Sequence, residues 1–133
     1  MKEIKVGTKA SVTALVDATK LAVTVKSGSL PVFATPMMVA MMEQAACKAL
    51  ADSLEETETS VGTAVSILHM SATPSGVQVT AEAEVTAVSG REITFRVTAE
   101  DHSGLIGEGT HKRFIVEEER FMQRTNAKRT PRA

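Results

Sequence analysis

The chain has 133 residues, of which 43% are hydrophobic and 3% aromatic, and its formal net charge is −1. This length suits one domain, and we expect residues 1–133 to form a single one. A nearly neutral chain lacks the basic excess with which proteins bind nucleic acids or membrane surfaces, so neither partner is expected. A domain this small also gains from a partner subunit, because alone it buries a modest share of its unfolded surface.

The start of the chain and its single cysteine narrow the class further. Residues 1–7 carry charges where a signal peptide needs a continuous apolar stretch, and no apolar run approaches the length of a membrane span. The sequence therefore predicts a cytoplasmic location. Cys47 lies in a helical pattern of small residues with no second cysteine, so we predict a packed, buried thiol that forms neither a disulfide nor a zinc site.

The first half of the chain predicts one strand and one long helix. A run containing Val and Thr favours a strand over residues 8–16, and an irregular connection with a Ser-Gly-Ser turn follows over 17–31. The spacing of apolar residues predicts a helix over 36–54. Thr35 is a candidate N-cap for it, and Pro36 suits its first position because the missing N–H costs nothing there.

The second half changes to a period of two and predicts four strands. Residues 61–73 are apolar on both faces and indicate a central strand, whereas 77–86 and 92–101 alternate apolar with polar residues, and a last strand covers 105–116. Short turns join these runs. A strand, a long helix and four consecutive strands indicate an α+β fold, with a five-stranded antiparallel sheet wrapped around one long central helix.

Glu43 and His69 are polar residues in apolar surroundings. Glu43 lies on an apolar face of the predicted helix, so its carboxylate is expected to be paired, protonated, in a wet cavity, or at an interface edge with its head in water. His69 lies in the apolar strand. It is either a core histidine held by a backbone carbonyl or a general base paired with Glu43.

Thr35 has two interpretations. As an N-cap, it would satisfy the first turn of the helix and need no functional reason. Its position beside the N–H groups of a helix terminus is also one where a thioester oxygen would be stabilised as negative charge develops. No histidine spacing typical of a metal site is present, so no metal is expected.

Four segments carry a resemblance to a known family: residues 32–43, 60–65, 69–74 and 107–113. Together they resemble the hotdog-fold acyl-CoA thioesterases, in particular the fluoroacetyl-CoA thioesterase branch. The joint spacing of Thr35, Glu43, Gly62 and His69 is the most specific part of the resemblance, which covers nearly the whole chain.

The resemblance implies an acyl-CoA thioester hydrolase with Thr35, Glu43 and His69 as catalytic residues. It implies that the backbone N–H of Gly62 helps to bind the thioester oxygen, and that His111 has a structural role. Two subunits, or a higher even number, would join their sheets edge to edge with active sites at the interface. No cofactor is implied, since CoA is part of the substrate.

Two departures from the family limit what is transferred. The stretch 17–30 contains no Phe and is shorter than the aromatic-bearing lid of the fluoroacetyl-CoA enzymes, and Pro36 replaces an expected glycine. We therefore transfer the reaction type and leave the acyl group open, together with the role of Glu43 as nucleophile or general base. A non-catalytic acyl-CoA or small-ligand binding module and an enoyl-thioester hydratase or dehydratase are the alternative functions.

The C-terminal residues 119–133 are expected to form a flexible basic tail. From residue 120 onward this segment contains no acid and carries five cations: Arg120, Arg124, Lys128, Arg129 and Arg132. They would either be solvated or contact the phosphates of CoA.

Overall fold

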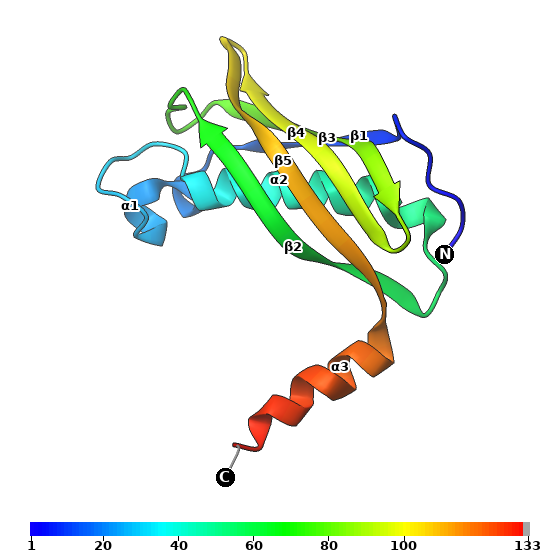
Figure 1. Ribbon diagram of the computed structural model, residues 1–133. Helices are drawn as coiled ribbons and strands as arrows, with labels where there is room; N and C mark the ends of the chain where they lie inside the picture. The colour runs from blue at the N-terminus through cyan, green and yellow to red at the C-terminus, as the bar shows by residue number, and fades with distance from the viewer. Residues whose placement is uncertain (132–133) are drawn as a thin grey trace.

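The computed structural model describes residues 1–131 and places a five-stranded antiparallel sheet around one long helix, α2 (Figure 1). The strands lie in the order β1-β3-β4-β5-β2, which confirms the predicted α+β architecture. The main elements in chain order are β1 (Lys9–Leu15), α1 (Ala22–Val25), α2 (Thr35–Leu50), β2 (Glu58–His69), β3 (Gln78–Ser89), β4 (Glu92–Asp101), β5 (Gly104–Glu117) and α3 (Glu118–Asn126).

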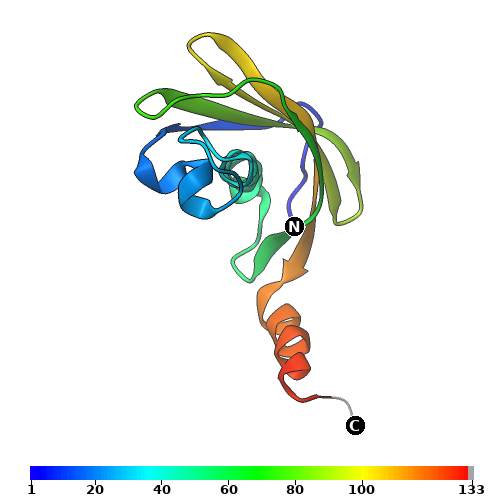
Figure 2. The same cartoon turned by 90° about the vertical axis from the view of Figure 1, so that its left-hand side faces the viewer.

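Helix α2 forms the centre of the core. Its buried face packs against the concave side of the sheet and consists of Met38, Met41, Met42, Ala45, Ala46 and Leu50. Figure 2 views this helix nearly end on, with the sheet curving over one side of it. The α-helix is shorter than the predicted 36–54, because a 3-10 turn over Ala51–Ser53 replaces its last residues.

Strands β3 and β4 show the predicted alternation. Side chains at every second position of both strands are buried against α2: Val79, Ala81, Ala83 and Val85 on β3, and Ile93, Phe95, Val97 and Ala99 on β4. The intervening polar residues are more exposed, as expected for an antiparallel sheet with one solvated face.

The prediction that residues 61–73 form a central strand is wrong, because β2 lies at the edge of the sheet. It pairs with β5 on one side only. Its apolar side chains are exposed as a result, with Val65 43% and Leu68 65% accessible. The apolar pattern on both faces therefore reflects an uncovered edge, which soluble proteins rarely leave open.

Cys47 is also placed differently from the prediction. The thiol is exposed, because Cys47 belongs to the side of α2 that the sheet does not cover. The helical pattern of small residues was interpreted correctly as helix, but a curved sheet encloses one side of a helix and leaves the other in solvent (Figure 2).

The C-terminal segment begins with a helix. Helix α3 follows β5 directly, and a 3-10 turn over Ala127–Arg129 continues it. Arg132 lies outside the described residues, and the flexibility expected for the segment stays a prediction. No helix within residues 1–131 is long and apolar enough to cross a membrane.

The close approach of β2 and β5 depends on Gly109, and this dependence yields a test. A Cβ at this position would overlap the backbone of β2 at Ser66 and Ile67, and backbone cannot move aside cheaply. We expect Gly109→Ala to destabilise the fold by about 3 kcal/mol, measured by denaturant unfolding.

Gly107→Ala is the matched control on the same strand, because the added Cβ would mainly meet the flexible side chain of Met38. We expect it to cost clearly less. Equal stability of Gly109→Ala and the wild type would contradict this account of β2–β5 packing.

Candidate active site

Thr35 and His69 form a hydrogen-bonded pair at one end of α2. The Thr35 hydroxyl lies 2.8 Å from Nδ1 of His69, although the two residues come from the first turn of α2 and the last residue of β2. The predicted capping role of Thr35 is wrong: Ala34 is the N-cap, and no side chain caps the helix. The Thr35 hydroxyl therefore hydrogen-bonds the imidazole and not the helix backbone.

A small cavity of about 230 Å³ opens beside this pair. Its walls come from the segment before α2, from the first residue of α2 and from the end of β2 and the residues that follow it. The lining residues are Ala22, Ser27, Val32, Phe33, Thr35, His69, Met70, Ser71 and Ala72. Phe33 meets the His69 ring edge on, with ring centroids 6.3 Å apart at an interplanar angle of 78°. The contact fixes the plane of the imidazole at the cavity wall.

The second ring nitrogen of His69 has no partner. Nε2 is buried and makes no hydrogen bond within residues 1–131. Burial lowers the pKa of His69 below its usual value of 6.5, and the Ser71 backbone acts weakly in the opposite direction. The imidazole is thus neutral at pH 7, with its Nε2 buried beside the cavity-lining residues.

A second polar cluster surrounds Glu43, two turns further along α2. Arg113 donates from Nη1 to Oε2 of Glu43 at 3.1 Å, and its other nitrogens bind the side chain and carbonyl of Ser60 at 2.8 and 3.0 Å. The guanidinium is 7% exposed and the Glu43 carboxylate 39%. Arg113 therefore holds one oxygen of a carboxylate that still reaches solvent.

His111 is a hydrogen-bond partner of Arg113. Its Nδ1 lies 2.8 Å from the carbonyl oxygen of Ala64, which can only accept, so Nδ1 carries the proton. Its Nε2 then accepts from Nη1 of Arg113 at 3.2 Å. Burial is the main cause of its lowered pKa, and the neighbouring Arg113 charge adds to it. A neutral His111 thus orients Arg113, which agrees with the structural role implied by the resemblance.

Gly62 lies directly against this cluster. A Cβ at this position would overlap Oε2 of Glu43 and approach Arg113 and His111 to 3.3 Å. The strand is also irregular here, because the register with β5 shifts between Gly62 and Ala64. Glycine is therefore required for the carboxylate to approach the edge strand this closely.

The predicted pairing of Glu43 with His69 is wrong within one chain. The structure joins His69 to Thr35, whereas Glu43 binds Arg113. Glu43 follows Thr35 by eight residues on α2, which at about 1.5 Å per residue separates them by roughly 12 Å along the axis. The four predicted site residues thus fall into two halves, Thr35 with His69 and Glu43 with Gly62.

Arg113 is a functional candidate that the sequence analysis missed. The period of two in β5 places His111, Arg113 and Ile115 on one buried face. An arginine on the same face as a buried isoleucine indicates a buried charge, and a buried charge needs a partner of opposite sign. Within residues 1–131, no set of three or more His, Cys, Asp and Glu side chains is arranged to bind a metal ion.

Comparison with known proteins identifies the family. The family model described as fluoroacetyl-CoA-specific thioesterase matches residues 16–119. The fluoroacetyl-CoA thioesterase of Streptantibioticus cattleyicolor is 44% identical over 97 residues, which are 73% of this chain and 70% of that protein.

Solved structures agree with this match. A structure of the fluoroacetyl-CoA thioesterase FlK is 37% identical, covers 98% of this chain and 100% of its own, and superimposes with a TM-score of 0.90. A variant of FlK in complex with acetyl-CoA is 36% identical over 93% of this chain and 98% of its own, with a TM-score of 0.88. A hot-dog-like protein from Thermanaerovibrio acidaminovorans is 25% identical, with a TM-score of 0.88 and coverage of 97% and 96%.

These matches span the sheet, α2 and both polar clusters. The chain therefore belongs to the family of fluoroacetyl-CoA-specific thioesterases and is a thioesterase with the hotdog fold.

Proposed function

We propose that this enzyme hydrolyses an acyl-CoA thioester at a site built from Thr35, His69, Glu43 and Gly62. The observation that carries the proposal is the hydrogen-bonded Thr35–His69 pair, which lines a small cavity at the start of α2. A relative binds acetyl-CoA, which supports a short acyl-CoA as the first substrate to test.

The two halves of the site come together if two chains pair their β2 edges. The positions of Gly62, Val65, Ile67 and His69 share the inner face of β2, because their partners on β5 include the inward residues Arg113 and His111. An antiparallel pairing centred on Ser66 keeps these faces matched. It sets Val65 opposite Ile67 of the partner subunit and His69 opposite the irregularity at Gly62.

This register places Glu43 of the partner subunit beside the Thr35–His69 pair, since Glu43 lies against Gly62. It also covers the exposed stretch of β2 around its own centre, where residues 62–66 and Leu68 are accessible. A homodimer with two composite sites follows, each with Thr35 and His69 from one chain and Glu43 and Gly62 from the other.

The chemistry uses side chains and water. In one route, Glu43 attacks the thioester carbon and forms an anhydride, which water then hydrolyses. In the other, Glu43 takes a proton from water while the water oxygen attacks the thioester carbon. The carbonyl oxygen gains negative charge beside the N–H of Gly62. The carbon–sulfur bond then breaks, and the CoA sulfur takes up the proton that the attacking water loses, relayed by neutral His69 as it accepts a proton at one ring nitrogen and releases one from the other. Arg113 holds Glu43 in place.

Two other functions remain as outcomes of the assay. Hydration of crotonyl-CoA without release of thiol would identify an enoyl-thioester hydratase, and tight binding with no turnover would identify an acyl-CoA binding module. Thiol release from acetyl-CoA or a longer acyl-CoA supports the hydrolase.

Substitution of each site residue tests the assignment. We expect Glu43→Gln and His69→Ala each to lower kcat by about 100-fold or more, and Thr35→Ala by about tenfold, since each removes a group that acts on the reacting atoms. Thiol release from acetyl-CoA measures this. Glu56→Gln, an exposed acid outside the site, is the control. Wild-type rates in all three site variants would refute the assignment.

The pH profile tests the environment of His69. Burial keeps its pKa below 6.5, so the neutral ring persists at pH 6.5 and is lost only as the pH falls further. We expect NMR titration to place the midpoint for His69 below 6.5. A midpoint for His69 above 7 would contradict a buried, neutral imidazole.

Complementation between two impaired variants tests the composite site. Glu43→Gln spoils one half of each site and Thr35→Ala the other, so a heterodimer of the two retains one complete site. Mixing and refolding equal amounts should restore roughly a quarter of the wild-type rate by random pairing. No recovery, with heterodimers confirmed by mass, would show that both halves act within one chain.

A further inference from the structure

Helix α3 and the 3-10 turn after it carry cations that form no ion pair within residues 1–131. Arg120 and Arg124 lie one turn apart on the same face, and Lys128 follows four residues later in the 3-10 turn. The ion pairs found within residues 1–131 involve none of these three, which we name the α3 stripe. Such an unpaired row of exposed cations is suited to an anionic ligand.

The α3 stripe lies far from the catalytic pocket of its own chain. In both Figure 1 and Figure 2, α3 projects away from the rest of the molecule beyond the sheet. Its first residue, Glu118, donates its N–H to the carbonyl of Thr57 at 3.0 Å, just before β2 begins. His69 is at the opposite end of the same strand. The stripe is therefore too far away to contact a ligand in the Thr35–His69 pocket of its own chain.

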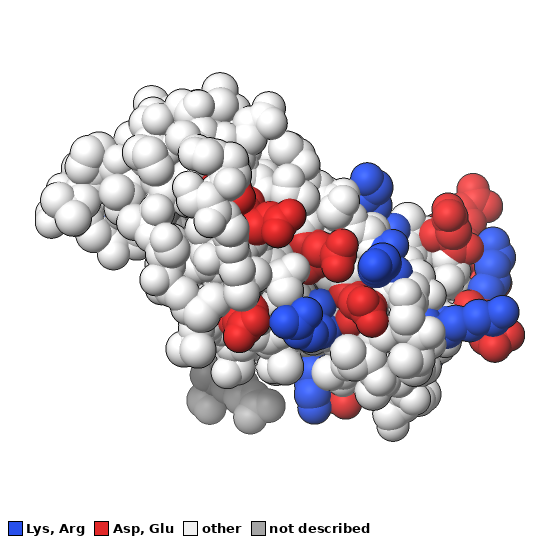
Figure 3. Space-filling view, turned by 90° about the horizontal axis from the view of Figure 1, so that it is seen from above, with Lys and Arg blue, Asp and Glu red and all other residues white. Residues whose placement is uncertain are grey.

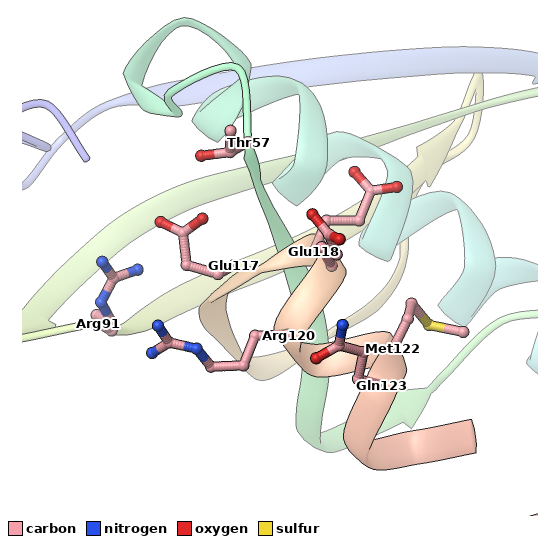
Figure 4. A pocket seen from close by; sticks show the side chains of 8 residues that line it. Thr57, Arg91, Glu117, Glu118, Arg120, Met122 and Gln123 are labelled. Carbon is pink, nitrogen blue, oxygen red and sulfur yellow. The ribbon is translucent and has the colours of Figure 1, made fainter. Parts of the chain in front are cut away.

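The base of α3 is hollowed and mixed in charge. A cavity of about 850 Å³ there is lined by Thr57, Arg91, Glu117, Glu118, Glu119, Arg120, Met122 and Gln123. Figure 4 shows Arg120 reaching toward the side where Arg91 and Glu117 lie. Arg91 is already bound to Glu58 at 3.0 Å. Arg120 thus stands at the edge of this mixed-charge hollow, and the rest of the stripe, Arg124 and Lys128, lies further along the chain.

The catalytic pocket, in contrast, is short of cations. None of the residues that line it is Lys or Arg. Of the two lysines nearby in sequence, Lys20 and Lys26, the first is already paired with Asp17 at 2.9 Å. Figure 3 shows the same contrast: the end of the molecule that contains α1, on the left, presents no blue residues on the face in view. A CoA thioester bound there would bring several phosphate charges with little to balance them.

The dimer of the proposed function joins these two observations. With β2 strands paired about Ser66, the Glu58 end of one strand lies alongside residues 71–73 of the partner subunit, two of which line the partner's pocket. Helix α3 starts at that end. We infer that the α3 stripe of one chain binds the phosphates of the CoA whose thioester occupies the partner's Thr35–His69 pocket.

The dimensions and chemistry suit this role. The segment from Glu118 to Arg129 is about 18 Å long if helical throughout, so its cations are spread over that length. The pantetheine arm likewise separates the thioester from the phosphates. Arginine binds phosphate oxygens in a bidentate manner, and exposed pairs of this kind weaken as salt rises.

The first experiment compares two substrates in the full-length dimer. Arg120→Gln with Arg124→Gln should raise KM for acetyl-CoA about tenfold, since two charged contacts are lost, and leave kcat near the wild-type value. KM for S-acetyl-pantetheine, which lacks the nucleotide phosphates, should not change. Lys5→Gln with Lys9→Gln removes the same charge at the distant β1 edge and should affect neither substrate.

The second experiment asks which chain supplies the stripe. A heterodimer of one Glu43→Gln chain and one Thr35→Ala chain keeps a single complete site, which uses Thr35 of the first chain. Adding the paired Arg120 and Arg124 substitutions to the Thr35→Ala chain should raise KM for acetyl-CoA tenfold. Adding them to the Glu43→Gln chain should not.

The outcomes separate this inference from the proposed function on which it rests. An equal loss on both substrates, no change on either, or an effect confined to the Glu43→Gln chain would overturn the role of the stripe while leaving hydrolysis intact. A heterodimer with no activity at all would overturn the composite site, and the inference with it.

Discussion

The rise of an α-helix is the constraint on which this active site depends. Thr35 and Glu43 are two turns apart on α2, and no side-chain rotation brings them to one substrate carbon. Each is instead held by its own partner, Thr35 by His69 and Glu43 by Arg113. A single chain therefore presents two separate polar clusters, and the proposed site joins them through a second copy of the fold.

The edge strand β2 provides the surface on which the two copies meet. One end of β2 carries His69, the other approaches Glu43 through Gly62, and the stretch between them is apolar and open. An exposed, apolar edge is a hazard for a monomer because it invites pairing with other chains. In the proposed dimer, the same edge fixes the distance and register between the two halves, so assembly and catalysis rest on one set of contacts.

Most of the fold could be predicted from local patterns in the sequence. The change from a helical period to a period of two located α2 and the strands, and the order of elements gave the α+β class. The edge position of β2 could not be predicted, because an apolar strand looks the same whether a neighbouring strand or a partner subunit covers it. The exposure of Cys47 was missed for a related reason: helical spacing does not tell how far the sheet curves around the helix.

The roles of the site residues stay a prediction, and their arrangement was missed. The types of Glu43 and His69 conflict with their surroundings, and this conflict is visible in the sequence. Their separation into two clusters depends on long-range pairing between β2 and β5, which places Arg113 and not His69 beside Glu43. The hydroxyl of Thr35 was interpreted locally as a cap, whereas a residue 34 positions away provides its partner.

Disulfide trapping at Ser66 tests the central claim, that β2 pairs with its own copy to complete the site, most directly. In a Cys47→Ser background, Ser66→Cys would place two thiols opposite each other at the centre of the pairing, within the range for a disulfide. We predict a covalent dimer after mild oxidation that still hydrolyses acetyl-CoA, whereas Thr110→Cys on neighbouring β5 should remain unlinked. Failure of Ser66→Cys to cross-link in an active enzyme would contradict the paired β2 edges.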